Sequence, residues 1–273
     1  MKKAKKIVLI TIGVCLLLEG ALKIYVAFEE HKRTLAPGND VQYNDVQYNV
    51  EALTPHEQSS LSGKKILFLG SSVTYGAAAE GQSFVELFET LDGVKAVKEA
   101  KSGTTLVDKT SILALLAFGN GDSYIKRLKQ IDTNTELDCV VCQLSTNDAT
   151  MNLPLGDISK EKDLSSFDTK TVTGAMEYII KYSKDTWNCP IVFYTGSYYE
   201  SEAYEAMVKR LYELRDKWDI EIIDLYTDKE FNDIDQKSYD FYMFDSIHPT
   251  KAGYIEWWMP KMEEELIRIM SQK

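Results

Sequence analysis

Apolar and polar residues alternate regularly between Lys64 and the C-terminus. Five runs are short enough to be strands: KILFLG (65–70), VKAVKEA (94–100), LDCVVCQLS (137–145), CPIVFYTG (189–196) and IEIIDLY (220–226). KILFLG and LDCVVCQLS are almost continuously apolar, as expected of strands that are covered on both faces. VKAVKEA is more polar, and this composition is typical of an edge strand.

Longer stretches with a helical spacing of apolar residues lie between these runs, at 83–91, 106–119, 123–131, 169–187 and 202–218, and another follows His248. Strands that alternate with helices predict an α/β domain whose parallel sheet is covered by helices on both faces. We therefore expect a three-layer α/β/α fold of flavodoxin-like type with a five-stranded parallel sheet. In such a sheet the ligand site lies beyond the carboxyl ends of the strands.

The first 28 residues form a different kind of segment, in which four lysines precede an apolar run from Ile7 to Leu18. That run is short for a membrane span and suits a signal peptide, but no small-residue cleavage site follows it. We expect residues 1–28 to be an uncleaved membrane anchor, with Glu19 and Lys23 paired or snorkelling and the rest of the chain outside the cell. A cleaved signal peptide and a buried N-terminal helix are the alternatives.

Residues 29–62 are polar, with two prolines and the tandem repeat NDVQYNDVQY, and they predict a tether or a strap over the surface of the domain. Two of the three histidines, His31 and His56, lie in this segment. Residues 63–273 then form the folded domain, and His248 is its only histidine. Any imidazole chemistry in the domain depends on that residue.

Composition limits the functional classes. A length of 273 residues suits one large α/β domain, and a net charge of −11 makes nucleic acid a poor partner, because phosphate favours a basic surface. Cys139 and Cys142 have the spacing of a metal or redox pair, but residues three apart on a strand point to opposite faces. We expect both to be small buried side chains.

Small and polar residues follow three of the predicted strands. GSSVTYG follows the first strand and places a serine hydroxyl at a strand-to-helix turn, and it lacks the spacing of a nucleotide-binding loop. KSGTT follows the second, where Gly103 allows close approach of a backbone N–H to a ligand. LSTNDAT follows the third, where the Asn147 amide can donate to an oxyanion. Taken singly, each of these segments also fits an ordinary turn or cap.

The segment FDSIHPTKAGY follows the last predicted strand. Pro249 keeps His248 out of the helical region and suits the first position of a helix. Asp245, three residues earlier, can bind one ring nitrogen and fix the imidazole tautomer. The alternative is a capping aspartate beside a surface histidine.

In this order, the four segments resemble the SGNH branch of the GDSL esterase and lipase family. The resemblance implies Ser72 as nucleophile, Asp245 and His248 as its partners, and an oxyanion hole made by Ser72, Gly103 and Asn147. Ser71 stands where the family usually has aspartate, and it is a rival nucleophile. Ser145 stands where a glycine often precedes the asparagine block, and the asparagine usual ahead of the glycine block is missing.

We therefore expect a serine esterase that hydrolyses short acyl esters, O-acetyl groups in particular, on carbohydrate or cell-envelope polymers. An O-acyltransferase of envelope polysaccharide, a lysophospholipase-like lipid esterase and a non-catalytic glycan-binding module are the alternatives. No metal or organic cofactor is expected, and the sequence does not fix the oligomeric state. The loop at 149–168 is expected at the catalytic end of the sheet, and Tyr198 and Tyr199 are expected at the edge of a shallow acyl site.

Overall fold

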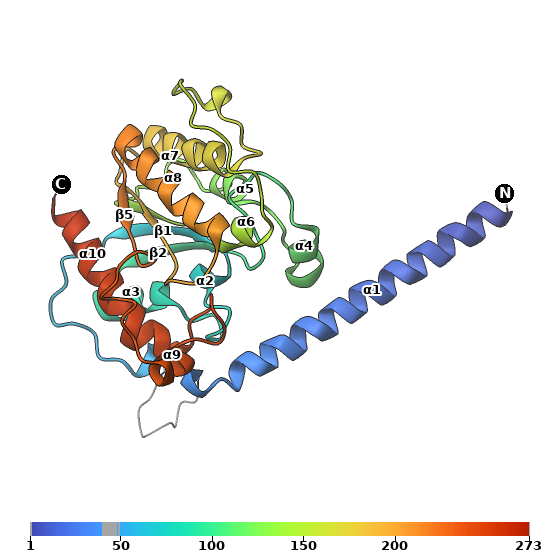
Figure 1. Cartoon of the computed structure of the whole chain (residues 1–273), viewed down its shortest axis with the longest axis horizontal. Helices are drawn as coiled ribbons and strands as arrows, with labels where there is room; N and C mark the ends of the chain where they lie inside the picture. Colours follow the sequence, from blue (N-terminus) through green and yellow to red (C-terminus); the bar gives the residue numbers. More distant parts are fainter. Residues whose placement is uncertain (1, 40–47, 49, 273) are drawn as a thin grey trace.

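The computed structural model describes residues 2–39, 48 and 50–272, with the backbone alone at 2–12, 14, 15 and 52. Five parallel strands form one sheet in the order β2-β1-β3-β4-β5 (Figure 1). The strands are β1 (Lys65–Gly70), β2 (Lys95–Ala100), β3 (Cys139–Gln143), β4 (Ile191–Tyr194) and β5 (Glu221–Ile223). Helices cover both faces of this sheet, so the predicted three-layer α/β/α fold of flavodoxin-like type is confirmed.

The helices longer than one turn are α1 (Lys2–Thr34), α3 (Phe84–Asp92), α4 (Ile112–Phe118), α5 (Tyr124–Leu128), α6 (Thr146–Thr150), α7 (Val172–Trp187), α8 (Glu202–Trp218), α9 (Gln236–Tyr242), the π-helix η5 (Gly253–Trp258) and α10 (Met259–Ser271). Shorter helical turns are η1 (Pro37–Asn39), η3 (Val50–Ala52), α2 (Ser72–Tyr75) and η4 (Leu164–Ser166). Of the predicted segments, 202–218 matches its helix at both ends.

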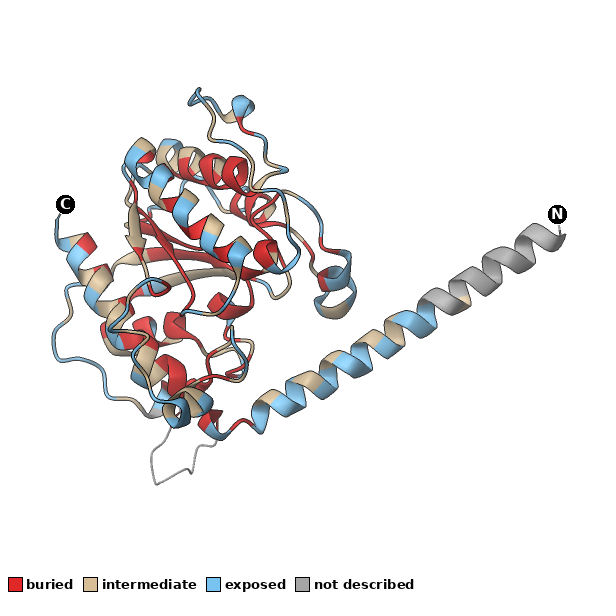
Figure 2. Cartoon of the chain, viewed as in Figure 1, coloured by how far each residue is buried: buried red, intermediate tan, exposed pale blue. Residues whose placement is uncertain are grey.

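Alternate residues of the central strands enter two separate apolar cores. Ile66 and Phe68 of β1 face the core that includes α3 and α10, whereas Leu67 and Leu69 face the core that includes α5, α7 and α8. Every one of these side chains is fully buried. Figure 2 shows the central strands coloured as buried along most of their length. This explains why KILFLG lacks the apolar–polar alternation of a half-exposed strand. Cys139 and Cys142 are likewise buried, and they lie on opposite faces of β3.

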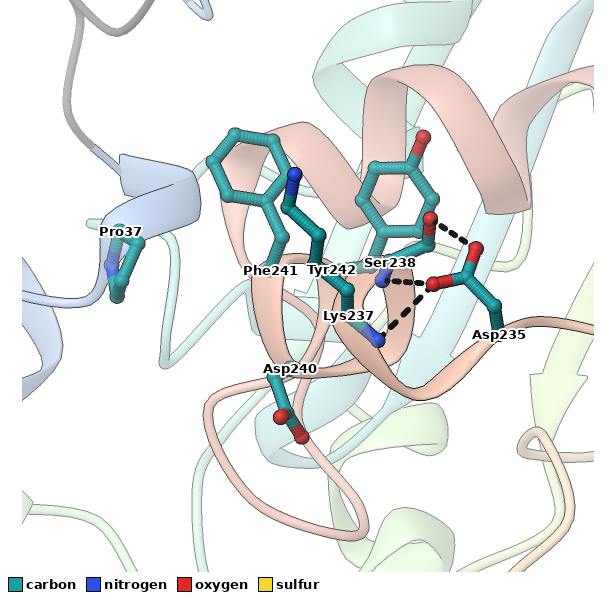
Figure 3. Close-up of a pocket in the computed structure, with 7 residues that line it drawn as sticks. All are labelled: Pro37, Asp235, Lys237, Ser238, Asp240, Phe241 and Tyr242. Atoms are coloured by element: carbon teal, nitrogen blue, oxygen red, sulfur yellow. Dashed lines mark hydrogen bonds between the residues drawn. The ribbon is translucent and has the colours of Figure 1, made fainter.

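Two segments differ from the predicted helices because side chains redirect the backbone. The segment predicted as a helix at 106–119 becomes helical only at Ile112, because the Asp148 carboxylate accepts hydrogen bonds from the backbone N–H groups of Leu106 and Val107. Helix α9 was not predicted, since none of its residues is buried and the sequence carries no apolar periodicity there. Asp235 starts α9 by accepting from the N–H groups of Lys237 and Ser238 (Figure 3).

The prediction that Pro249 occupies the first position of a helix is wrong. Pro249 forms an antiparallel bridge with Met243, and the helical backbone begins at Lys251. Thr250 caps this helix, since its hydroxyl accepts from the Gly253 N–H at 3.2 Å. His248 therefore lies in a closed loop rather than at the first turn of the helix.

The N-terminal helix α1 continues to Thr34, past the predicted boundary at residue 28, and it extends away from the body (Figure 1). Among the residues that the structure describes, no helix has both the length and the apolar character needed to span a bilayer. Asn39 is buried: its amide nitrogen donates to Ala78 O at 2.5 Å, and its amide oxygen accepts from the Lys251 N–H at 2.8 Å. Leu61 is also buried, so the described residues between 35 and 62 form a strap against the domain.

Candidate active site

The turn between β1 and α2 positions Ser72. A β-carbon at Gly70 would overlap the Thr74 side chain, so glycine is required where the strand ends. Ser72 is the first residue of the four-residue helix α2, and Gly76 ends that helix in the left-handed conformation, with φ of 82°. The Ser72 side chain is thus held at the carboxyl edge of the sheet, where the sequence placed it.

A tight loop between α9 and the C-terminal helices positions Asp245 and His248. The bridge between Met243 and Pro249 closes this loop, and Phe244 N–H donates to His248 O at 2.9 Å. Asp245 Oδ1 accepts from the backbone N–H groups of Ile247 and His248, each at 2.8 Å. Asp245 therefore caps its own turn and also contacts the imidazole ring.

The structure brings three of the predicted residues into one hydrogen-bonded chain. His248 Nε2 lies 2.8 Å from Ser72 Oγ, and His248 Nδ1 lies 2.9 Å and 2.8 Å from the two Asp245 oxygens. A serine, an imidazole and a carboxylate in this order allow the imidazole to accept the hydroxyl proton while the carboxylate stabilises the resulting cation. The geometry is that of an activated serine nucleophile.

The Asp245 carboxylate is kept in its charged form. Burial by itself would raise the pKa of Asp245, but the hydrogen bond and charge of His248, together with two backbone N–H groups, outweigh burial and lower the pKa. A carboxylate that stays ionised can accept a hydrogen bond from the Nδ1–H group of His248. The unprotonated Nε2 is then free to accept a hydrogen bond from the Ser72 hydroxyl.

The two adjacent serines point to different places. Ser71 is fully buried, and both its N–H and its hydroxyl are directed at Gln143 Oε1, at 2.9 Å and 3.3 Å. The same amide oxygen accepts from the Thr74 hydroxyl at 2.8 Å. Gln143 thus supports the turn from beneath and holds Ser71 inward, which leaves Ser72 as the serine beside the imidazole.

Gly103 lies in the loop after β2, and Asn147 lies in the first turn of α6 and contacts Thr104, the residue that follows Gly103. Gly103 has a φ of 74°, and Ala114 Cβ of α4 is 3.3 Å from the position that a β-carbon would occupy there. The Asn147 amide nitrogen donates to Thr104 O at 2.8 Å, and its second hydrogen is not used in that bond. Within the described residues, no backbone acceptor pairs with the N–H groups of Ser72 or Gly103. These three donor groups are therefore available to an oxyanion.

Sequence reasoning missed a buried arginine beneath the site. Arg127 is 1% exposed, and its guanidinium donates to Gly70 O at 2.8 Å, to the Thr104 hydroxyl at 3.2 Å and to Glu99 O. Burial lowers the pKa of Arg127, partly offset by the charges of Tyr124 and Glu99. The only sequence signal was a cation on the apolar side of a short amphipathic helix.

Asp148 was also missed as a positioning residue. Burial raises the pKa of Asp148, while hydrogen bonds from Ser145 and from the N–H groups of Val107 and Leu106 act in the opposite direction. These contacts fix the segment that follows Gly103 and the helix that carries Asn147. The aspartate beside Asn147 in STND was the signal that pointed to it.

Two surface hollows differ in volume and in the segments that line them. One of about 470 Å³ lies over α9, lined by Pro37, Asp235, Lys237, Ser238, Asp240, Phe241 and Tyr242 (Figure 3), and contains none of the three hydrogen-bonded residues. A smaller one of about 210 Å³ is lined by Tyr75, Ala77, Ala100, Lys101, Ser102 and Phe118 of the α2, β2 and α4 regions, together with Glu30 and Arg33. The lining of the smaller hollow also lacks the three hydrogen-bonded residues, but it includes Tyr75 of α2, the helix that begins with Ser72, and Ser102, the neighbour of Gly103 in sequence.

The loop at 149–168 does not lie wholly at the catalytic end, contrary to expectation. Its central part crosses to the far end of α8, where Lys217 Nζ donates to Ser159 O at 2.5 Å and Phe167 packs edge-on against Trp218. Leu153, Leu155, Ile158 and Leu164 are partly buried against the same core. The loop is a brace across α7 and α8 rather than a lid.

Comparison with known proteins agrees with this geometry. The model of the GDSL-like lipase/acylhydrolase family matches residues 68–254. A structure described as a GDSL-like lipase from Bacteroides ovatus is 21% identical with a TM-score of 0.53, over 79% of this chain and 100% of that one. A Lactobacillus plantarum protein is 19% identical with a TM-score of 0.56, over 77% and 98% of the two chains.

An acetyl xylan esterase is 16% identical with a TM-score of 0.51, over 73% of this chain and 98% of that one. At these identities the likeness concerns the fold. None of the curated proteins compared with the chain matches it.

The two serines provide a matched pair of variants. Ser72→Ala removes the hydroxyl beside His248, so we expect kcat for p-nitrophenyl acetate to fall by about 10⁴-fold or more and labelling by a fluorophosphonate probe to disappear. Ser71→Ala should keep both, because that hydroxyl faces Gln143. Loss of labelling in Ser71→Ala with labelling retained in Ser72→Ala would show that the wrong serine is assigned.

Proposed function

Because the chain belongs to the GDSL-like lipase/acylhydrolase family and is an ester hydrolase, we propose that Ser72, His248 and Asp245 are its catalytic triad. The observation that carries this assignment is the 2.8 Å contact between Ser72 Oγ and His248 Nε2, with Asp245 on the other ring nitrogen. No other histidine lies in the folded domain to serve as base.

The reaction proceeds in two steps. Ser72 Oγ bonds to the acyl carbon as His248 takes its proton, and the tetrahedral adduct then collapses, with His248 returning the proton to the departing alcohol. Water next attacks the acyl-serine while His248 removes a water proton. The ester bond to Ser72 breaks, the serine recovers its proton and the carboxylic acid leaves.

The negative charge on the tetrahedral oxygen is stabilised by the backbone N–H groups of Ser72 and Gly103 and by the Asn147 amide. The Asn147 side chain is already fixed by its bond to Thr104 O, so it needs little reorganisation during the reaction. Removing one such donor typically raises the barrier by about 3 kcal/mol.

The proposed substrates are short acyl esters, O-acetyl groups in particular, on carbohydrate or cell-envelope polymers. The hollow lined by Tyr75 and Ser102, of about 210 Å³, is smaller than the ~300–1,000 Å³ pockets that enclose drug-sized ligands. A second hollow of about 320 Å³ is lined by Tyr198, Tyr199, Tyr239 and Trp257. Ser246, which lies between Asp245 and His248 in the sequence, also lines this hollow. Aromatic faces suit the apolar faces of a sugar, and the acetyl xylan esterase has the same fold.

A lipid ester is the second candidate, favoured by one observation. Helix α4 contacts Gly103 through Ala114 and exposes most of its large apolar side chains, namely Ile112, Leu113, Leu115, Leu116 and Phe118. An exposed apolar surface beside an oxyanion hole is where a long acyl chain would rest.

Two further alternatives are an acyltransferase, which differs from a hydrolase at the second step, and a glycan-binding module, which catalyses no reaction. An acyltransferase would use the same triad and pass the acyl group to a sugar hydroxyl instead of water, so acetate release without an acceptor supports hydrolysis. A glycan-binding module would not react with a fluorophosphonate probe.

A series of p-nitrophenyl esters of increasing acyl length distinguishes an esterase for short acyl groups from a lipid esterase. We expect kcat/KM to be highest for acetyl and to fall beyond about four carbons, because the small hollow offers no continuous apolar trough at about 0.8 kcal/mol per buried methylene. The double variant Ile112→Ser/Leu113→Ser should leave acetate hydrolysis unchanged, as should Leu35→Ser, an exposed control outside α4. Rates that rise steadily to long chains in the parent and drop only in the α4 variant would establish the lipid ester.

We further propose that residues 1–28 are a single-pass anchor that leaves the catalytic domain outside the membrane, with secretion after signal cleavage as the alternative. The lysines before Ile7, the apolar run to Leu18 and the lack of a small-residue cleavage site support this location. The extension of α1 away from the body is compatible with it (Figure 1).

Cell fractionation tests the location. The full chain should sediment with membranes, and the chain without residues 1–28 should not, because the apolar run is then missing. Protease added outside intact cells should remove the catalytic domain of the full chain. A full-length product in the cytosolic fraction would contradict the proposal.

A further inference from the structure

A second cluster of chemically active side chains lies at the opposite end of the sheet from Ser72. His56 comes from the strap, Asp92 is the last residue of α3, and Glu263 is in the first half of α10. Asp92 lies three residues before β2 begins, so the cluster is at the amino ends of the strands. The hydrolytic chemistry described above uses none of these groups.

The three side chains converge closely. His56 Nδ1 is 3.0 Å from Glu263 Oε1 and 3.5 Å from Asp92 Oδ1. One ligand atom from each residue lies within 4.8 Å of the other two. An imidazole and two carboxylates at these distances form a set of potential metal ligands.

Asp92 gives this cluster an unsatisfied buried acceptor. The residue is 2% exposed, and its Oδ1 accepts from the Ser59 hydroxyl at 2.6 Å. Its Oδ2 is buried without a hydrogen-bond partner in the described part of the chain. A buried carboxylate oxygen left in this state is costly, and it points to a group that binds there.

The local charge is also unbalanced. Burial raises the pKa of Glu263, the charge of Asp92 raises it further, and His56 only partly offsets the two. Within the described residues, no lysine or arginine is ion-paired with Asp92 or Glu263. Two carboxylates therefore face one imidazole, with one positive charge at most to balance them.

The backbone around the cluster is already fixed. His56 N–H donates to Leu91 O at 2.9 Å, and Gly63 N–H donates to Gly93 O at 2.9 Å, so the strap is held on both sides of the cluster by the end of α3. Met262 and Leu266, on either side of Glu263, are buried in the core shared with α3. The potential ligands thus need little rearrangement to act together.

We propose that His56, Asp92 and Glu263 bind a zinc-type divalent transition-metal ion that fastens the strap to α3 and α10. Zinc bonds of about 2.0–2.2 Å in a tetrahedron place ligand atoms about 3.3–3.6 Å apart, close to the spacings in the cluster. The ion neutralises both carboxylates while His56 stays uncharged, and water completes the coordination. An imidazole ligand disfavours calcium and magnesium, which prefer oxygen.

The competing explanation is a protonated His56 that bridges the two carboxylates without any metal. Both explanations predict that the cluster stabilises the fold. They differ in whether stability responds to zinc, and this difference decides between them.

The experiment uses the full chain, treated with EDTA and then dialysed. Zn²⁺ binding is measured by calorimetry, and the unfolding temperature is measured with and without Zn²⁺. The variants are Glu263→Gln, which keeps the shape of the side chain, and His56→Ala. Glu264→Gln is the matched control on the same helix, and His248→Ala excludes the imidazole of the active site as the ligand.

We expect one Zn²⁺ per chain, and a rise in unfolding temperature of about 5 °C or more when the free ion exceeds Kd a hundredfold. Glu263→Gln and His56→Ala should each weaken binding by at least about tenfold and lose the shift. Glu264→Gln and His248→Ala should keep both. An unfolding temperature that falls in Glu263→Gln and His56→Ala but never responds to Zn²⁺ would establish the protonated bridge and overturn the proposal, as would binding that only His248→Ala abolishes.

Discussion

The guanidinium of Arg127 joins the carboxyl ends of β1 and β2 to the loop that carries Gly103. Gly70 is the last residue of β1, and Glu99 is the residue before the end of β2. The carbonyl oxygens of both accept hydrogen bonds from this one side chain. A buried cation is tolerated only when its donors are used, and the guanidinium makes four hydrogen bonds, to Gly70 O, Glu99 O, Asp122 O and the Thr104 hydroxyl. Arg127 therefore ties the strand end that precedes Ser72 to the loop that carries Gly103.

β3 and β4 complete the support from beneath. Gln143 at the end of β3 accepts from Ser71 and Thr74, and the Thr74 hydroxyl lies 2.6 Å from the Tyr194 hydroxyl at the end of β4. The first turn of α2 thus rests on the ends of β3 and β4 through polar contacts in a dry environment, where unpaired groups would be costly. Ser72 is therefore supported by polar contacts from the strand ends, whereas His248 is positioned by a loop.

The elements that could be predicted are those in which local signals agree. KILFLG forms β1 over the expected residues, and α8 begins after the capping residue Ser201 and ends at Trp218 as its apolar spacing indicated. The placement of the segments carrying Ser72, Asp245 and His248 at one edge of the sheet was predictable because parallel strands all end there, whereas the choice of Ser72 over Ser71 rested on the resemblance to the SGNH branch.

The misses have physical causes. No residue of helix α9 is fully buried, so no periodicity marks it, and Pro249 joins a bridge that depends on Met243. The loop at 149–168 looked polar because its apolar residues are widely spaced, yet several pack against the core. Arg127 and His56 act through partners that are distant in sequence, which no local pattern reveals.

The strap is fastened to the domain by a contact between residues that are very far apart in the sequence. The side-chain oxygen of Asn39 accepts a hydrogen bond from the Lys251 N–H, and the two residues are 212 positions apart in the sequence. The contact between Ser72 and His248 closes across 176 residues in the same region. Both contacts require the segment that follows α9, so the strap and the pairing of Ser72 with His248 depend on the same long-range closure of the chain. A change that displaces this segment would disturb both contacts at once.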